Sequence, residues 1–205
     1  MIGCITDTGN GYSVGPIPGI GGPFETSADF FVQWAAGAAF PLEKHKVQQI
    51  TPSEHFGEVW NSIVNFPSQV AKFAESYNFR KGPLPVIHGY LYRSNILMSG
   101  DCNVDAIIDW EDAIVAPWEL VEFIKDLRVV PPAMNGPSYQ ESLSACQKRD
   151  KQRTYVKYIR ETEKKQLLDS TLSLVLSNSA VQDFAHAFWL WHEGKSGFYR
   201  NSGIM

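Results

Sequence analysis

Residues 85–97 read Pro-Val-Ile-His-Gly-Tyr-Leu-Tyr-Arg-Ser-Asn-Ile-Leu, and residues 107–112 read Ile-Ile-Asp-Trp-Glu-Asp. An apolar run ends in a His-Gly turn, Asn95 opens a second apolar run, and a third ends in an acidic cluster. Polar side chains at the ends of neighbouring strands are typical of an active site carried by loops on a rigid sheet. The pattern predicts three such strands, over about 85–88, 95–98 and 104–109.

The chain of 205 residues is long enough for one domain with a real core, and we expect a single domain over residues 1–205. Its 18 basic and 22 acidic residues contain no basic run, which argues against nucleic-acid binding. No apolar stretch reaches the length of a membrane span, and no charged leader precedes an apolar run at the N-terminus. Neither a disulfide framework nor a zinc site fits three widely spaced cysteines: Cys4, Cys102 and Cys146. We expect a cytoplasmic protein that needs no cofactor and contacts neither nucleic acid nor membrane.

Short strands are expected on both sides of the turn-forming segment 7–11. The stretch 15–23 is too rich in Pro and Gly for regular structure, and its prolines remove donors that a phosphate-binding loop needs. It is expected to form a lid or a wall. Apolar periodicity and capping residues predict helices over about 27–39, 53–65, from Pro67 to a break at 81–83, 117–127, 138–165, 166–176 and 181–193. The tail beyond Gly194 is expected to be loosely held.

Residues 88–95, His-Gly-Tyr-Leu-Tyr-Arg-Ser-Asn, resemble the H-G-D-x-x-x-x-N loop of the aminoglycoside phosphotransferase and choline kinase-like family. Residues 108–111, Ile-Asp-Trp-Glu, resemble the metal-binding strand end of the same family, and the flanking residues are similar to its fungal-type members. The resemblance covers the C-terminal lobe of that family. It implies an α+β, mainly helical fold: a protein-kinase-like C-terminal lobe with a small β component carrying a degenerate catalytic loop, without the N-terminal nucleotide lobe.

The resemblance places Asn95 and Asp109 at the two metal-holding positions and His88 at the structural histidine of the loop. Tyr90 stands where the family has its catalytic Asp. A neutral phenol is a poor base and brings no anionic charge to the site. The family's ATP-covering loop, its Lys and the Glu that pairs with it are not found in this sequence. We therefore expect no ATP-dependent phosphoryl transfer by this chain alone and no bound metal.

The candidate catalytic residues are His88, Tyr90, Asp109 and Glu111. His88 either bonds the backbone of its loop or acts as a general acid or base. Tyr90 either fills the space of the missing Asp or donates a hydrogen bond to a substrate carbonyl. Asp109 either accepts backbone donors as a scaffold or works with Glu111 as an acid or base. Strand alternation is expected to point Asp109 and Glu111 to the same side.

The candidate substrate-binding residues are Arg93, Trp110 and Trp189. Arg93 either forms an exposed ion pair or binds an anionic group of the substrate. Trp189 belongs to an aromatic group on the last predicted helix, which we interpret as core, although the resemblance places it in the region that walls the acceptor pocket. His186 and His192 lie six residues apart, off the i,i+4 spacing of a helical metal site.

The leading hypothesis is a repurposed kinase-like lobe that acts on an apolar small molecule, such as a natural-product intermediate. Its chemistry would be non-phosphoryl acid/base catalysis, for example cyclisation, isomerisation or dehydration. One alternative is a non-catalytic pseudokinase that binds a metabolite or a protein; another is a truncated small-molecule phosphotransferase. The expected partner is a small-molecule substrate. The exposed cleft is expected to be covered either by a second copy of the chain or by a lid formed by residues 15–23.

Overall fold

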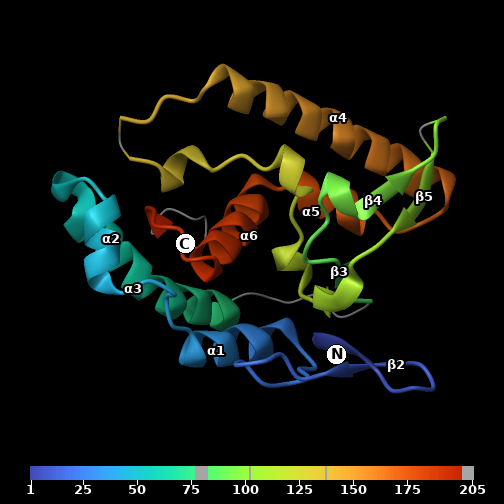
Figure 1. The fold of residues 1–205 in the computed structure, drawn as a ribbon, viewed down its shortest axis with the longest axis horizontal. Helices are drawn as coiled ribbons and strands as arrows, with labels where there is room; N and C mark the ends of the chain where they lie inside the picture. Colours follow the sequence, from blue (N-terminus) through green and yellow to red (C-terminus); the bar gives the residue numbers. More distant parts are fainter. Residues whose placement is uncertain (77–82, 102, 137, 200–205) are drawn as a thin grey trace.

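The computed structural model describes residues 1–76, 83–101, 103–136 and 138–199. The protein is α+β, with helices forming most of the body and two small antiparallel sheets beside them (Figure 1). The helices are α1 (Ser27–Gly37), α2 (Lys44–Ile50), α3 (Ser53–Ser76), α4 (Leu143–Lys165), α5 (Thr171–Ser177) and α6 (Ser179–His192). A membrane-spanning helix is absent from the described part of the chain.

The larger sheet has four antiparallel strands in the order β2 (Tyr12–Gly15), β1 (Gly3–Asp7), β6 (Ile114–Val115) and β3 (Val86–Ile87). The smaller sheet is a hairpin of β4 (Ile96–Met98) and β5 (Val104–Ile107). The predicted strands around segment 7–11 are confirmed. The three predicted central strands exist, but β3 lies in a different sheet from β4 and β5. The reason is β6, a two-residue strand that the sequence does not reveal and that joins β3 to the N-terminal β1.

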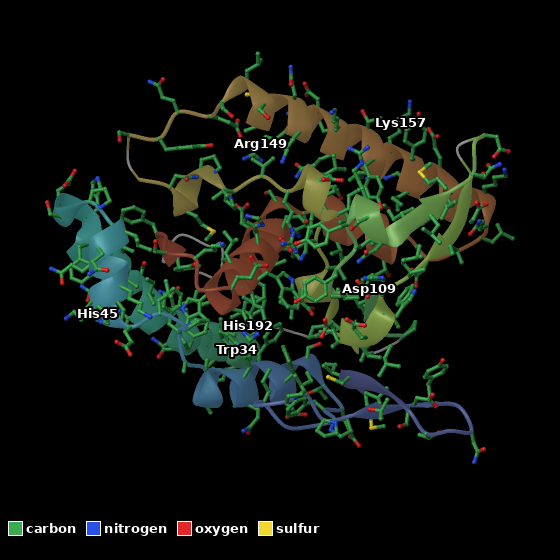
Figure 2. All side chains as sticks on the ribbon, viewed as in Figure 1. Trp34, His45, Asp109, Arg149, Lys157 and His192 are labelled. Carbon is green, nitrogen blue, oxygen red and sulfur yellow. The ribbon has the colours of Figure 1, made fainter. Side chains whose placement is uncertain are left out.

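An aromatic core lies where α1, α3 and α6 meet. Its members are buried and include Phe30, Phe31, Trp34, Phe66, Phe184, Phe188 and Trp191. Trp34 extends from α1 toward this junction (Figure 2). Burial of one such side chain stabilises the fold by roughly 1.5–3 kcal/mol. The expectation that the last helix packs on more than one face is confirmed by its contacts with α5 and with residues 118–120 in addition to this core.

Pro67 lies inside α3 and does not begin a new helix, so the prediction of two helices between 53 and 77 is wrong. A proline lacks the N–H that would bond the carbonyl four residues earlier, here that of Ile63. The indole Nε1 of Trp191 donates to this carbonyl oxygen at 2.9 Å in the buried core. A side chain from α6 therefore replaces the missing backbone donor, and α3 continues to Ser76.

The predicted helix over 117–127 is also wrong. This segment forms two 3₁₀ turns, Trp118–Leu120 and Lys125–Leu127, with extended backbone between them. Side chains of neighbouring helices donate hydrogen bonds to its backbone carbonyl oxygens. Trp189 Nε1 donates to that of Leu120, Gln182 Nε2 to that of Val121 and Gln152 Nε2 to that of Leu127. The segment runs between α4 and α6 (Figure 1), and its carbonyls accept hydrogen bonds from side chains of both helices.

The loop 15–23, expected to form a lid or a wall, packs its Ile17 and Ile20 side chains against the main core. The tail differs from expectation: Tyr199 is fully buried, while residues 200–205 lie outside the described part. The helix α2 is not predicted, because the sequence between the first two predicted helices reads as a polar connection. Val47 is the one buried residue of α2, so this helix leaves no periodic apolar pattern in the sequence. The predicted break at 81–82 and Cys102 fall outside the described residues.

Candidate functional site

His88 ties the end of β3 to the end of β5. The side chain is buried, and its Nε2 lies 2.8 Å from the carbonyl oxygen of Ile108. Because a carbonyl only accepts, Nε2 carries a proton in this hydrogen bond. Nδ1 is buried and has no hydrogen-bond partner among the described residues. The half-exposed ring of Trp110 covers the imidazole, with 4.5 Å between ring centroids.

The side chains of Asn95 and Asp109 are hydrogen-bonded to each other. The amide Nδ2 of Asn95 donates to Oδ2 of Asp109 at 3.1 Å and to the backbone oxygen of Tyr90 at 2.9 Å. Asp109 lies where the chain leaves β5, and its backbone adopts a left-handed conformation with φ of 72° (Figure 2). The residues after it form a 3₁₀ turn, so strand alternation does not continue to Glu111. The expectation that Asp109 and Glu111 share one side of a strand is therefore wrong.

The side chain of Tyr90 lies outside this hydrogen-bonded group, and 47% of the residue's surface is exposed. Its ring stacks on that of Tyr92, and Lys125 Nζ lies 4.7 Å from the centroid of Tyr90. Lys125 Nζ also donates to the Tyr92 hydroxyl at 2.8 Å. Arg93 and Glu111 are exposed, and neither side chain has a hydrogen bond or ion pair with another described residue.

A cavity of about 370 Å³ lies beneath the 88–91 turn. We name it the tryptophan cavity; its walls include Ile87, His88, Leu91, Ile107, Trp110, Trp118, Phe123, Lys125, Leu172 and Trp189. Three of the sequence-predicted site residues are thus brought together: His88, Trp110 and Trp189. Tyr90, Arg93, Asn95, Asp109 and Glu111 do not line it, so the predicted site divides into a cavity wall and an outer polar group.

The tryptophan cavity is also lined by charged residues that are not among the site residues predicted from the sequence. Glu122 and Arg128 line it and form an ion pair that is largely buried. The other carboxylate oxygen of Glu122 lies 2.8 Å from Nδ1 of His186, while Arg128 lies 3.9 Å from the carboxylate of Glu193. The sequence carries no signal for this group, because 64 residues separate Glu122 from His186 and the spacing of His186 bears only on a metal site.

A second cavity, of about 390 Å³, lies on the other side of Glu122, Phe123 and Arg128, which line both. We name it the arginine cavity; its walls include Glu122, Arg128, Arg149, Gln152, Arg153, Arg160, Gln182, Asp183 and His186. Burial raises the pKa of Asp183, while the charges of Arg149 and His186 act in the opposite direction. The two cavities differ in character, because aromatic side chains dominate one and guanidinium groups the other.

Comparison of the chain with protein-family models, with curated proteins and with solved structures yields no match. The resemblance of the central segment to a phosphotransferase loop therefore stays a prediction from its residues. Within the described ranges, no group of three or more His, Cys, Asp and Glu side chains is arranged to hold a metal ion.

Proposed function

We propose that this chain is a kinase-like C-terminal lobe that binds an apolar small molecule in the tryptophan cavity and does not transfer phosphate. The observation that carries the proposal is the cavity itself, which His88, Trp110 and Trp189 all line. Its volume falls within the range of roughly 300–1,000 Å³ that is usual for small-molecule sites. Aromatic walls with a few polar groups are also the usual lining of such sites.

Two contacts support the kinase-like interpretation of the loop. The bond between His88 and the Ile108 carbonyl and the bond between Asn95 and Asp109 both join the first motif to the second. Residues at the family's metal-holding positions thus lie within hydrogen-bond distance of each other. Tyr90, at the position of the catalytic base, turns toward Tyr92 and Lys125, and it is not among the residues that line the cavity.

The ligand is expected to have an apolar body and one polar group. Ile87, Leu91 and Phe123 offer no hydrogen bonds, so a polar group buried among them would lose its contacts with water without compensation. Arg128 and Lys125 are the cationic residues among those that line the cavity. A natural-product intermediate with a carbonyl or hydroxyl group at one end of a hydrocarbon skeleton has this distribution of polarity.

Acid/base turnover by His88 is a second candidate, favoured by the absence of a partner for Nδ1 among the described residues. An imidazole held at Nε2 by a backbone carbonyl has its second nitrogen free to exchange a proton. Nδ1 is buried, and the ring of Trp110 lies tilted over the imidazole, with 4.5 Å between ring centroids. Displacement of the Trp110 side chain by a ligand would bring a substrate atom to Nδ1.

The binding proposal is tested by native mass spectrometry of protein purified from its source under mild conditions. The expected result is a co-purified apolar molecule that Leu91→Trp, which fills the cavity, no longer retains. Val32→Trp serves as the matched control, because Val32 is an exposed residue of α1 that does not line the cavity. Retention of the same molecule by Leu91→Trp would contradict the proposal.

Turnover is separated from binding by metabolite profiling of a deletion strain. If His88 catalyses a reaction, a precursor accumulates on deletion, and wild type restores the normal profile while His88→Gln does not. The melting temperature and ligand binding of His88→Gln must be close to wild type for this comparison. A normal profile restored by His88→Gln would leave binding as the function of the cavity.

The exposed face around the loop supports the proposed dimer. Tyr90, Tyr92, Ile107, Ile108 and Trp110 are all large apolar or aromatic side chains that are more than one-third exposed. Such patches are unusual on monomers and are commonly covered by a partner. Light scattering coupled to size-exclusion chromatography should give twice the mass of the 23.0 kDa chain, and a monomer at all concentrations would contradict it.

A further inference from the structure

The arginine cavity has no part in the proposed function, and its lining is that of a separate binding site. Four arginines are among the residues that line it, Arg128, Arg149, Arg153 and Arg160, together with the acidic residues Glu122 and Asp183. Guanidinium groups bind carboxylate and phosphate oxygens through paired hydrogen bonds, which is why arginine recurs at oxyanion sites.

His186 gives an independent indication of a ligand. Its side chain is 8% exposed, and Nδ1 lies 2.8 Å from Oε1 of Glu122. Because a carboxylate accepts, Nδ1 carries a proton and the ring orientation is held. Nε2 is buried and has no hydrogen-bond partner in the described part of the chain. A buried nitrogen that lacks a partner at a cavity wall is costly unless something else bonds it.

The protein's own carboxylates do not fully satisfy the arginines. Glu122 is shared by Arg128 and His186. Arg149 pairs with Glu141, which is not among the lining residues, at 2.5 Å. Arg153 pairs with Asp150, but both side chains are at least 70% exposed, so this pair contributes little.

Two further charged residues line the cavity: Arg160, which could attract an anion, and Asp183, whose carboxylate would compete with an anion for Arg149 and His186. Arg160 forms no ion pair with any other described residue and lines the cavity. Asp183, on α6 one turn before His186, interacts with Arg149 and His186 through its charge. An anion bound between Arg149 and His186 would displace this interaction.

We propose that the arginine cavity is a binding site for a small oxyanion, a carboxylate or a phosphate group, held by Arg149 on α4 and His186 on α6. Because an oxyanion only accepts, His186 binds it as the doubly protonated ring, which donates from Nδ1 to Glu122 and from Nε2 to the anion. Arg128 holds Glu122, which fixes the ring of His186, and Arg153 and Arg160 raise the local positive potential at the mouth. Arg149 lies on the side of α4 that faces the 121–131 segment, whereas Lys157 lies on the outer side of the same helix (Figure 2). The two residues therefore provide a matched pair of charges, one inside the site and one outside.

The test is isothermal titration of the purified full chain with inorganic phosphate and, separately, with succinate, at constant ionic strength set by chloride. Saturable binding of either probe supports the proposal, and the tighter of the two identifies the ligand group. Arg149→Gln is expected to weaken binding at least tenfold, since a hydrogen bond to a charged group contributes about 1.5–3 kcal/mol. Lys157→Gln, which removes the same charge from the outer face, should leave the Kd unchanged.

Asp183→Asn is expected to change binding in the opposite direction. Removal of the competing carboxylate should tighten binding severalfold, a result that general destabilisation of the fold does not produce. Should Arg149→Gln not fold, as judged by its melting curve, Arg149→Lys carries the same test, because it keeps the positive charge but removes the paired hydrogen bonds of the guanidinium group. Absence of binding with both probes overturns the proposal. So does equal weakening by Arg149→Gln and Lys157→Gln, which would indicate nonspecific attraction.

Discussion

Replacement of Trp191 by Phe tests how α3 passes through Pro67. The indole Nε1 of Trp191 is the donor to the Ile63 carbonyl, which Pro67 leaves without its backbone partner. Phe lacks this donor, so the carbonyl would remain buried and unbonded, at a cost of about 1–3 kcal/mol. The smaller ring also leaves a cavity in the aromatic core, which adds a second cost of similar sign.

Pro67→Ala separates the two costs. The alanine introduced by this change has an N–H that bonds the Ile63 carbonyl within the helix, so in this background Trp191→Phe leaves a cavity but no unbonded oxygen. The double variant should therefore be more stable than the sum of the single changes predicts, by about 1–2 kcal/mol.

The assay is urea denaturation followed by far-UV circular dichroism, which does not depend on the fluorescence of the mutated tryptophan. The four proteins of the cycle should unfold in one transition with similar m-values. Additivity of the two changes within about 0.5 kcal/mol would refute the reasoning. It would mean that the Trp191 bond does not substitute for the backbone donor that Pro67 lacks.

Three further outcomes are expected. Gly89→Ala should lower the melting temperature, because Gly89 has φ of 78° and an added Cβ would lie 2.9 Å from the Asp112 carbonyl oxygen. As the control, Gly57→Ala should raise the melting temperature, because Gly57 lies on α3 with open space around the added Cβ. Burial, with a contribution from Glu193, raises the pKa of Tyr199. The folded protein then keeps a proton that the unfolded chain releases above about pH 10, so the free energy of unfolding should fall as pH rises past that value, and less steeply in Tyr199→Phe; parallel curves would contradict this. Mg²⁺ with ATP at millimolar concentration should not raise the melting temperature of wild type or of Tyr90→Asp, and a clear increase in either would restore the phosphotransferase interpretation.

Local signals in the sequence were sufficient for most helices. The sequence offers Thr26 or Ser27 as the cap of α1, and Thr26 is the one that accepts a hydrogen bond from the Asp29 backbone. The aromatic spacing of α6 places Phe184 and Phe188 in the core. The errors arise where a distant side chain decides the local structure. Trp191 allows a helix to continue through Pro67, and Gln182 and Gln152 hold the 118–127 segment out of a helix.

In the candidate site, too, some contacts follow from local sequence motifs and others depend on distant parts of the chain. The contact between Asn95 and Asp109 follows from a motif spacing that the sequence shows. The pairing of Glu122 with His186 does not, because it depends on how a segment wrongly predicted as helix lies against α6. Trp110 illustrates both: its place after Asp109 is visible in the sequence, and its position over the His88 ring depends on the 3₁₀ turn that follows β5.

The most direct test of the central claim is equilibrium binding of a neutral fluorescent hydrocarbon probe, N-phenyl-1-naphthylamine, to the tryptophan cavity. The proposal predicts saturable binding at one site per chain, which Leu91→Trp abolishes and Val32→Trp leaves unchanged. Equal binding to both variants, or no saturable binding to wild type, would contradict the claim that this cavity takes an apolar ligand.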